Sequence, residues 1–123
     1  MIKISLSELI TLVPLLKELI NSSFDSSLSF KIGRLIRELD KELELFDISR
    51  KKIIDKYGLR NEQGNFVVEN NQVKIIDPEN CNNELQNLLN TVIEIYSEKI
   101  PISCFKNIKI TPAQAMILDL IIE

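Results

Sequence analysis

The residues best placed to do chemistry lie in one polar loop, at positions 57–65. Tyr57, Arg60, Asn61 and Asn65 bring an aromatic ring, a guanidinium group and two amides together within this short segment. A guanidinium group can bind a phosphate through two hydrogen bonds, and a tyrosine ring can stack on a base. The loop is therefore the predicted site of a small anionic, nucleotide-like ligand, if the protein binds one. The alternative interpretation is a helix cap followed by the start of a hairpin.

Other catalytic or metal-binding patterns are missing from the sequence. There is no histidine, which removes the commonest general base and metal ligand and excludes a Ser-His-Asp triad. Cys81 and Cys104 stand alone, without the paired spacing of a zinc site, and we expect two reduced thiols. Gly33, Gly58 and Gly64 are too scattered for a phosphate-binding loop. We therefore expect a non-enzyme with no catalytic residues, no cofactor and no metal.

The charge balance gives no bulk attraction to nucleic acid or to an anionic membrane. The 15 Lys and Arg residues oppose 18 Asp and Glu residues, for a net charge of −3, so a nucleic-acid partner is not expected. The acidic stretch from Asp40 to Asp47 alternates with lysine and leucine, as on a solvated helix face. No apolar run reaches about 18 residues, and the opening residues lack the features of a signal peptide. We expect no membrane contact and a cytoplasmic location.

The strongest structural signal is a long helix from Ser27 to Tyr57, whose apolar residues recur at steps of three or four. This helix would extend about 45 Å, whereas a compact domain of this length is roughly 35 Å across. Part of the helix should therefore project and need a partner, which predicts a homo-oligomer. The apolar C-terminal segment also needs cover, from its own chain or from another subunit. The candidate interface residues are Leu43, Phe46, Ile53, Leu118 and Ile121.

An earlier helix is expected to pair with the long one as an antiparallel hairpin. Ser5 and Glu8 have the spacing of a capping box, which places the start of this helix. Phe24, in the polar turn that follows, is a candidate packing anchor. Gly33 lies on the long helix and is interpreted as a point where the first helix approaches closely. Leu39 is expected to be buried against the first helix near that point.

Beyond the long helix the sequence changes character. Gly58 is expected to end the helix in a left-handed conformation. Segments 66–68 and 73–76 are rich in β-branched residues and are predicted to be strands. Asn70 and Asn71 lie between them, and asparagine tolerates the positive φ of a tight hairpin turn.

Two more helices and further extended segments complete the chain. Asp77, followed by proline, is predicted to cap the third helix. Segment 91–96 is predicted to be a strand, and 108–110 a short edge strand. Thr111, again followed by proline, is predicted to cap a last helix over 113–123.

These elements define an α+β fold. We expect a long N-terminal antiparallel helical hairpin, then a small antiparallel β-sheet with two further helices. The whole chain, residues 1–123, is predicted to be a single domain, with the helical hairpin in 1–57 and a small α+β lobe in 58–123.

Several segments together resemble a known family. They are Lys-Ile-Ser-Leu-Ser-Glu-Leu-Ile at 3–10, the leucine-rich helix ending Lys-Tyr-Gly at 56–58, Asn-Glu-Gln-Gly-Asn at 61–65, Asn-Glu-Leu-Gln-Asn-Leu-Leu at 83–89 and Thr-Pro-Ala at 111–113. Taken together, this pattern resembles a family of small proteins encoded by phages and prophages of Gram-positive bacteria. The resemblance transfers no site residues. It implies a phage accessory protein that acts in the host-cell cytoplasm on a protein partner of the host or the phage.

The expected function is therefore that of a non-enzymatic, self-associating interaction protein encoded by a phage. Such a protein would inhibit or sequester a component of host defence. Two alternatives stay open: a phage assembly or scaffolding factor, and a protein that binds a small anionic, nucleotide-like ligand.

Overall fold

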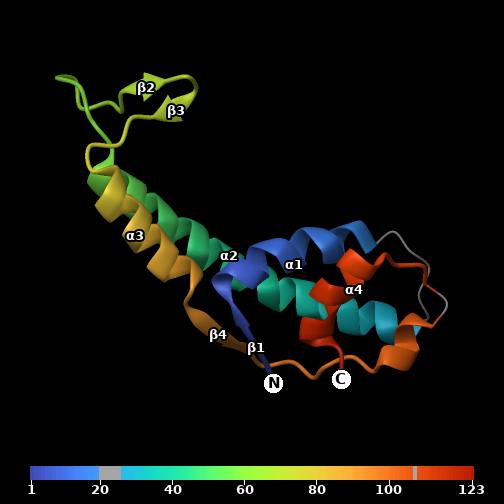
Figure 1. The fold of residues 1–123 in the computed structure, drawn as a ribbon. Coiled ribbons are helices and arrows are strands. Elements are labelled where there is room, and N and C mark those ends of the chain that lie inside the picture. The colour runs from blue at the N-terminus through green and yellow to red at the C-terminus, as the bar shows by residue number, and fades with distance from the viewer. Residues whose placement is uncertain (20–25, 107) are drawn as a thin grey trace.

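The computed structural model describes residues 1–19, 26–106 and 108–123, and it has an α+β fold (Figure 1). The predicted fold class is therefore confirmed, including the long N-terminal helix pair that packs together. The elements in chain order are β1 (Ile2–Ser5), α1 (Leu6–Leu19), α2 (Ser26–Tyr57), β2 (Val68–Glu69), β3 (Gln72–Val73), α3 (Pro78–Leu89), β4 (Val92–Ile95), the 3₁₀ turn η1 (Ile102–Phe105), α4 (Pro112–Leu118) and the 3₁₀ turn η2 (Asp119–Ile121).

The α2 helix is the spine of the molecule. Its 32 residues extend about 48 Å. The α1 helix packs along its N-terminal half and α3 along its C-terminal half (Figure 1). Much of the length that was expected to project is therefore covered by α3. The residues of α2 that are buried follow helical spacing and are Leu28, Ile32, Leu35, Ile36, Leu39 and Phe46.

The start of α1 is fixed as the sequence predicts. The Ser5 N–H donates to Glu8 Oε1 at 2.9 Å, and the Glu8 N–H donates to Ser5 Oγ at 3.1 Å, which is a capping box. Leu39 is fully buried, as expected. The interpretation of Gly33 is wrong, because Gly33 is exposed and a Cβ built there would meet nothing within 4 Å. Phe24 lies outside the described residues.

Two separate antiparallel sheets take the place of the single sheet that was expected. In one, β1 pairs with β4, so that Ile2 lies opposite Ile95 and Ile4 opposite Ile93. The predicted strand over 91–96 is confirmed as β4, but its partner β1 was not predicted. The predicted strand over 108–110 is wrong, since these residues have no regular structure.

The other sheet is the predicted hairpin. Asn70 and Asn71 form its turn with φ values of 52° and 63°, as a two-residue turn between twisted strands requires. The paired residues of β2 and β3 lie around this turn, somewhat closer to it than the predicted segments. The hairpin projects from the end of the α2–α3 pair (Figure 1).

Both later helices begin where the sequence predicts. The Asp77 side chain accepts the N–H of Asn80, and Thr111 forms a capping box with Gln114. The last helix is shorter than expected, because α4 ends at Leu118 and the chain continues as η2. No helix of the described residues is both long enough and apolar enough to cross a membrane.

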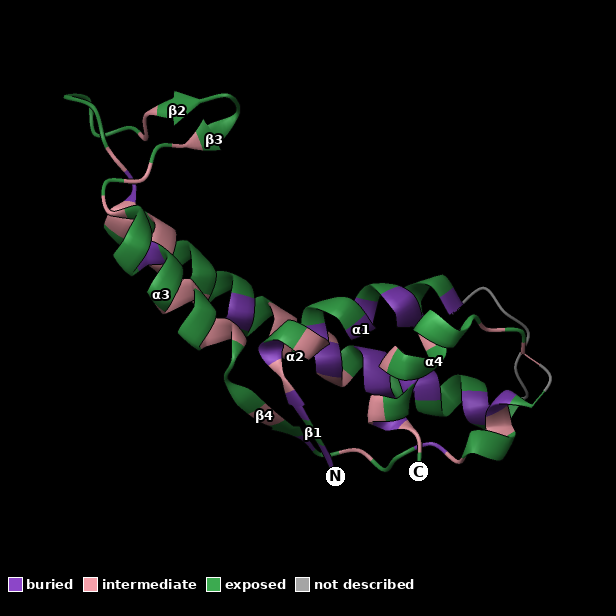
Figure 2. Cartoon of the chain, in the orientation of Figure 1, coloured by how far each residue is buried: buried purple, intermediate pink, exposed green. Residues whose placement is uncertain are grey.

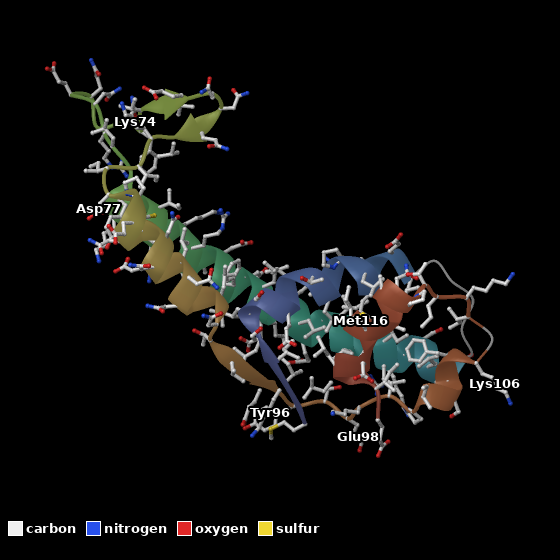
Figure 3. All side chains as sticks on the ribbon, viewed as in Figure 1. Lys74, Asp77, Tyr96, Glu98, Lys106 and Met116 are labelled. Carbon is white, nitrogen blue, oxygen red and sulfur yellow. The ribbon has the colours of Figure 1, made fainter. Side chains whose placement is uncertain are left out.

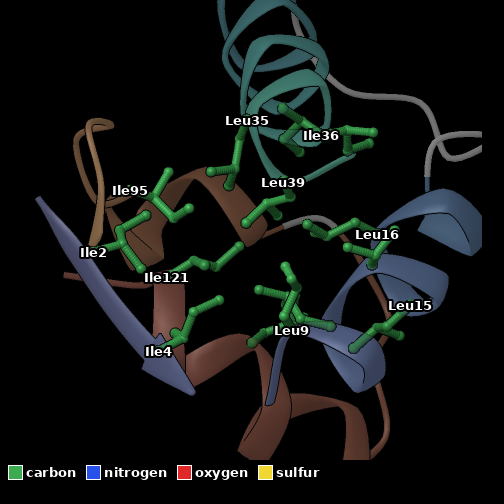
Figure 4. Close-up of a cluster of buried hydrophobic side chains, with 14 of the residues drawn as sticks. Ile2, Ile4, Leu9, Leu15, Leu16, Leu35, Ile36, Leu39, Ile95 and Ile121 are labelled. Atoms are coloured by element: carbon green, nitrogen blue, oxygen red, sulfur yellow. The ribbon is translucent and has the colours of Figure 1, made fainter. Parts of the chain in front are cut away.

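The core lies where β1, α1, α4, β4 and the N-terminal half of α2 meet (Figure 2). Ile4 of β1, Leu9 and Leu16 of α1, and Leu39 of α2 point into it together with Ile121 of η2 (Figure 4). All buried side chains among the described residues are apolar. The hairpin, by contrast, is mostly exposed (Figure 2).

Candidate functional site

Arg60, which was predicted to bind a small anion, already contacts other groups of its own chain. Its Nη1 donates to the Gly64 carbonyl oxygen at 2.6 Å, and its Nη2 donates to the Asp55 carboxylate. The guanidinium group also lies over the Phe66 ring, 4.1 Å from the ring centroid, in a cation–π contact. Arg60 therefore fastens the hairpin to the end of α2, and its charge is already met by Asp55.

The two asparagines of the predicted ligand site also serve the loop itself. The Asn61 Oδ1 accepts the N–H groups of Gln63 and Asn65, each at 3.0 Å. The Asn65 carbonyl oxygen accepts the Asn61 N–H at 2.8 Å. Gly64 completes the turn with a φ of 80°, a conformation that favours glycine. This arrangement is the helix cap and hairpin start of the alternative interpretation.

Tyr57 is half-buried at the last position of α2, and its ring lies 5.0 Å from the Lys56 Nζ. The same Lys56 Nζ contacts Glu84 Oε1 of α3 at 2.8 Å. The hydrogen bond to Glu84 raises the pKa of Lys56. This contact ties α3 to the end of α2, next to the point where the hairpin leaves.

Gly58 has a different role from the one expected. Its φ is not in the left-handed region, so the predicted cap conformation is wrong. A Cβ built at Gly58 would lie 2.5 Å from Phe66 Cε1 and 2.8 Å from the Ile54 carbonyl oxygen. The glycine is needed because the Phe66 ring packs directly against the backbone.

Beyond Gly58, three backbone hydrogen bonds close a small ring. The Leu59 N–H donates to Lys74, the Lys74 N–H to Val67 and the Val67 N–H to Leu59, each at 2.8 Å. Each of the three backbone segments that contain these residues is therefore hydrogen-bonded to the other two, which fixes their arrangement.

A groove lies between this lobe and α2, with a volume of about 520 Å³. Ile48 and Ile54 of α2 and Phe66 of the lobe give it apolar walls. The remaining lining residues are charged and are Arg50, Lys51, Lys52 and Asp55. We call this hollow the α2–hairpin groove.

The electrostatic character of the α2–hairpin groove is positive. Its lining has three cations against one carboxylate, and that carboxylate, Asp55, is already bonded to Arg60. Arg50 lies 3.9 Å from Asp47, at the limit of an ion pair. Lys51 and Lys52 have no ion pair among the described residues. This positive groove lies on a chain whose net charge is −3.

The predicted interface residues are buried or half-buried within their own chain. Leu118 and Ile121 are 0% exposed, and Phe46 is also buried. Leu43 and Ile53 are half-buried. The apolar C-terminal segment is thus covered by its own chain, which is the first of the two alternatives for it.

Two large apolar side chains that face outward on the C-terminal half of α2 were missed. Leu45 is 58% exposed and Ile48 is 51% exposed. Both lie off the stripe that runs through Leu39, Leu43 and Phe46, among charged neighbours. Apolar residues on the charged side of an amphipathic helix were the available signal, because such residues are not explained by the core.

The outward face of the β1–β4 sheet is a second exposed apolar surface. Val92 is 63% exposed, and Tyr96 is 83% exposed at the end of β4 (Figure 3). Met1, next to Tyr96 in the antiparallel register, is also exposed. Lys3 and Glu94 lie between these apolar residues and form an ion pair, with 3.5 Å from the Lys3 Nζ to the Glu94 Oε1.

The two thiols are free and do not form a disulfide. Cys81 is buried on α3, and burial raises the pKa of its thiol. Cys104 is half-buried in η1. In the part of the chain that the structure describes, no three His, Cys, Asp or Glu residues are grouped so that they could hold a metal ion.

Comparisons with family models, with curated proteins and with solved structures found no match to this chain.

Proposed function

We propose that the protein acts by binding another protein through the α2–hairpin groove, without catalysing a reaction. The observation that carries this proposal is the groove itself, whose apolar walls are rimmed by three cations. Two of them, Lys51 and Lys52, form no ion pair among the described residues. Apolar side chains that line a hollow are typical of a binding surface. Leu45, three residues before Ile48 on α2, is also exposed.

The cellular role rests on the sequence alone. The resemblance to small phage and prophage proteins suggests that the bound partner is a component of host defence, which the protein inhibits or sequesters. A phage assembly protein is the alternative partner.

The experiment places a photo-crosslinking amino acid at position 48, inside the groove. A matched control places it at position 116, since Met116 is 79% exposed on α4 and lies outside the groove lining. Irradiation in the producing cell should link position 48 to one partner protein that mass spectrometry identifies. Position 116 should not give this product. Equal products at both positions, or none at position 48, would contradict binding in the groove.

Self-association is a separate part of the proposal, and the outward face of the β1–β4 sheet supports it. A two-fold interface requires a patch that is complementary to itself. Here one cation, Lys3, and one anion, Glu94, lie between exposed apolar side chains. In a dimer with two-fold symmetry, Lys3 of each copy can therefore pair with Glu94 of the other. The predicted interface on Leu118 and Ile121 is not used, because these residues are buried.

Light scattering tests self-association. The mass in solution should be at least twice the 14.1 kDa of the chain. Tyr96→Ser should shift the mass toward the monomer, whereas Ile102→Ser, a change at another exposed apolar residue, in η1, should not. A monomer at every concentration would refute this part and leave the groove proposal standing.

A further inference from the structure

The α2–hairpin groove is preformed. Arg60 joins Asp55 of α2 to the Phe66 ring of the lobe, and Gly58 lets that ring pack on the backbone. The backbone hydrogen bonds among Leu59, Val67 and Lys74 fix the lobe further. A site that is already ordered loses little conformational entropy on binding.

The cations of the groove lie along the same turn as its apolar wall. Lys51 and Lys52 follow Ile48 by three and four residues, so all three lie on neighbouring parts of one helix face. Ile48 to Ile54 covers about 9 Å of the helix axis. An occupant therefore meets apolar side chains and ammonium groups together, over more than one helical turn.

We propose that the α2–hairpin groove binds an acidic amphipathic segment of the partner protein. This inference rests on the proposed function and names the chemistry of its partner. Apolar side chains of the segment contact Ile48, Ile54 and Phe66. Its carboxylates pair with Lys51 and Lys52, which have no ion pair among the described residues. Charge complementarity of this kind sets specificity and speeds association.

A nucleic acid fits this groove less well. Arg60 covers one face of the Phe66 ring at 4.1 Å, so that face is closed to a stacking base. The walls are apolar, and the chain as a whole is acidic. A nucleic-acid site instead needs an extended basic surface.

The test uses three labelled probes and the full chain. The first is a synthetic helical peptide with leucines at helical spacing and glutamates elsewhere. The second carries lysine in place of every glutamate, and the third is a mixed-sequence single-stranded oligonucleotide. Fluorescence anisotropy should show binding of the glutamate peptide at least roughly tenfold tighter than binding of the lysine peptide.

Variants locate the binding. Lys51→Glu combined with Lys52→Glu should weaken binding of the glutamate peptide by roughly tenfold or more. Lys106→Glu combined with Lys109→Glu makes the same change in net charge at two exposed lysines outside the groove lining, and it should leave binding unchanged. Ile48→Ser should weaken binding of both peptides, because it removes an apolar contact. Circular dichroism checks that each variant is folded.

The outcomes separate the inference from the proposed function. Equal binding of both peptides, lost in Ile48→Ser, would overturn the acidic chemistry and keep protein binding in the groove. Oligonucleotide binding that the Lys51→Glu and Lys52→Glu pair abolishes would also overturn it, in favour of nucleic acid. If no probe binds, the inference fails, and crosslinking at position 48 decides whether the proposed function fails as well.

Discussion

Gly33 lies within α2 and Gly58 directly follows it, and the same substitution should change stability in opposite directions at the two sites. At Gly33 an added Cβ meets nothing within 4 Å, in the middle of an exposed helix face. A glycine in a helix interior costs roughly 0.5–1 kcal/mol relative to alanine. Gly33→Ala should therefore raise the free energy of unfolding by about that amount.

At Gly58 the added Cβ would lie 2.5 Å from Phe66 Cε1 and 2.8 Å from the Ile54 carbonyl oxygen. The ring or the backbone must move, and an overpacked site typically costs about 1–3 kcal/mol. Gly58→Ala should therefore lower the free energy of unfolding. Phe66→Leu should rescue it only in part, because the contact with the Ile54 carbonyl oxygen remains.

Urea unfolding followed by circular dichroism measures both changes. The two variants are matched, since each adds a single methyl group to the chain. A loss of stability in Gly33→Ala would mean that another element does approach that face of α2. A stable Gly58→Ala would mean that the Phe66 ring does not pack on the backbone, and the argument for a preformed groove would fall with it.

Three further predictions follow from burial and pairing. Leu39→Ala should lower the free energy of unfolding by about 2–5 kcal/mol, because Leu39 is fully buried in the core; an unchanged urea midpoint would contradict its position in the core. Nucleotide titration calorimetry should give no binding that depends on Arg60, because Asp55 already meets its charge; binding by the wild type that Arg60→Ala abolishes would restore the ligand site. Cys81 should react with a thiol reagent more slowly than Cys104 near neutral pH, because burial raises the Cys81 pKa and keeps its thiol protonated; mass spectrometry of the partly labelled protein compares the two.

The helices could be predicted because their signals are local. The capping residues Ser5, Asp77 and Thr111 each act on a backbone group within the next turn, so the sequence alone places them. The periodicity of α2 likewise needs no knowledge of what covers it. The turn at Asn70 and Asn71 is also local, since it depends only on the conformations that asparagine tolerates.

The errors have a common cause in contacts between distant parts of the chain. The pairing of Ile2 with Ile95 joins β1 to β4, the strand that follows α3. Nothing local in either segment specifies this pairing. The segment 108–110 has strand-like residues, but no strand among the described residues pairs with it. Gly33 was expected to lie beside the first helix, and Gly58 was expected to be a helix cap. The role of each glycine depends on which distant element lies beside it, and the sequence does not show this.

Some residues of α2 are covered by the rest of the fold, and others stay exposed where a partner can contact them. The expectation of a projecting helix compared its length with that of a compact domain, and it left out cover by a later element. Because α3 supplies that cover, length alone no longer requires a partner. What the core does not explain is the opposite face, where Leu45 and Ile48 remain exposed and Lys51 and Lys52 have no ion pair among the described residues. The composition of this face, and not the length of the helix, therefore indicates a binding surface.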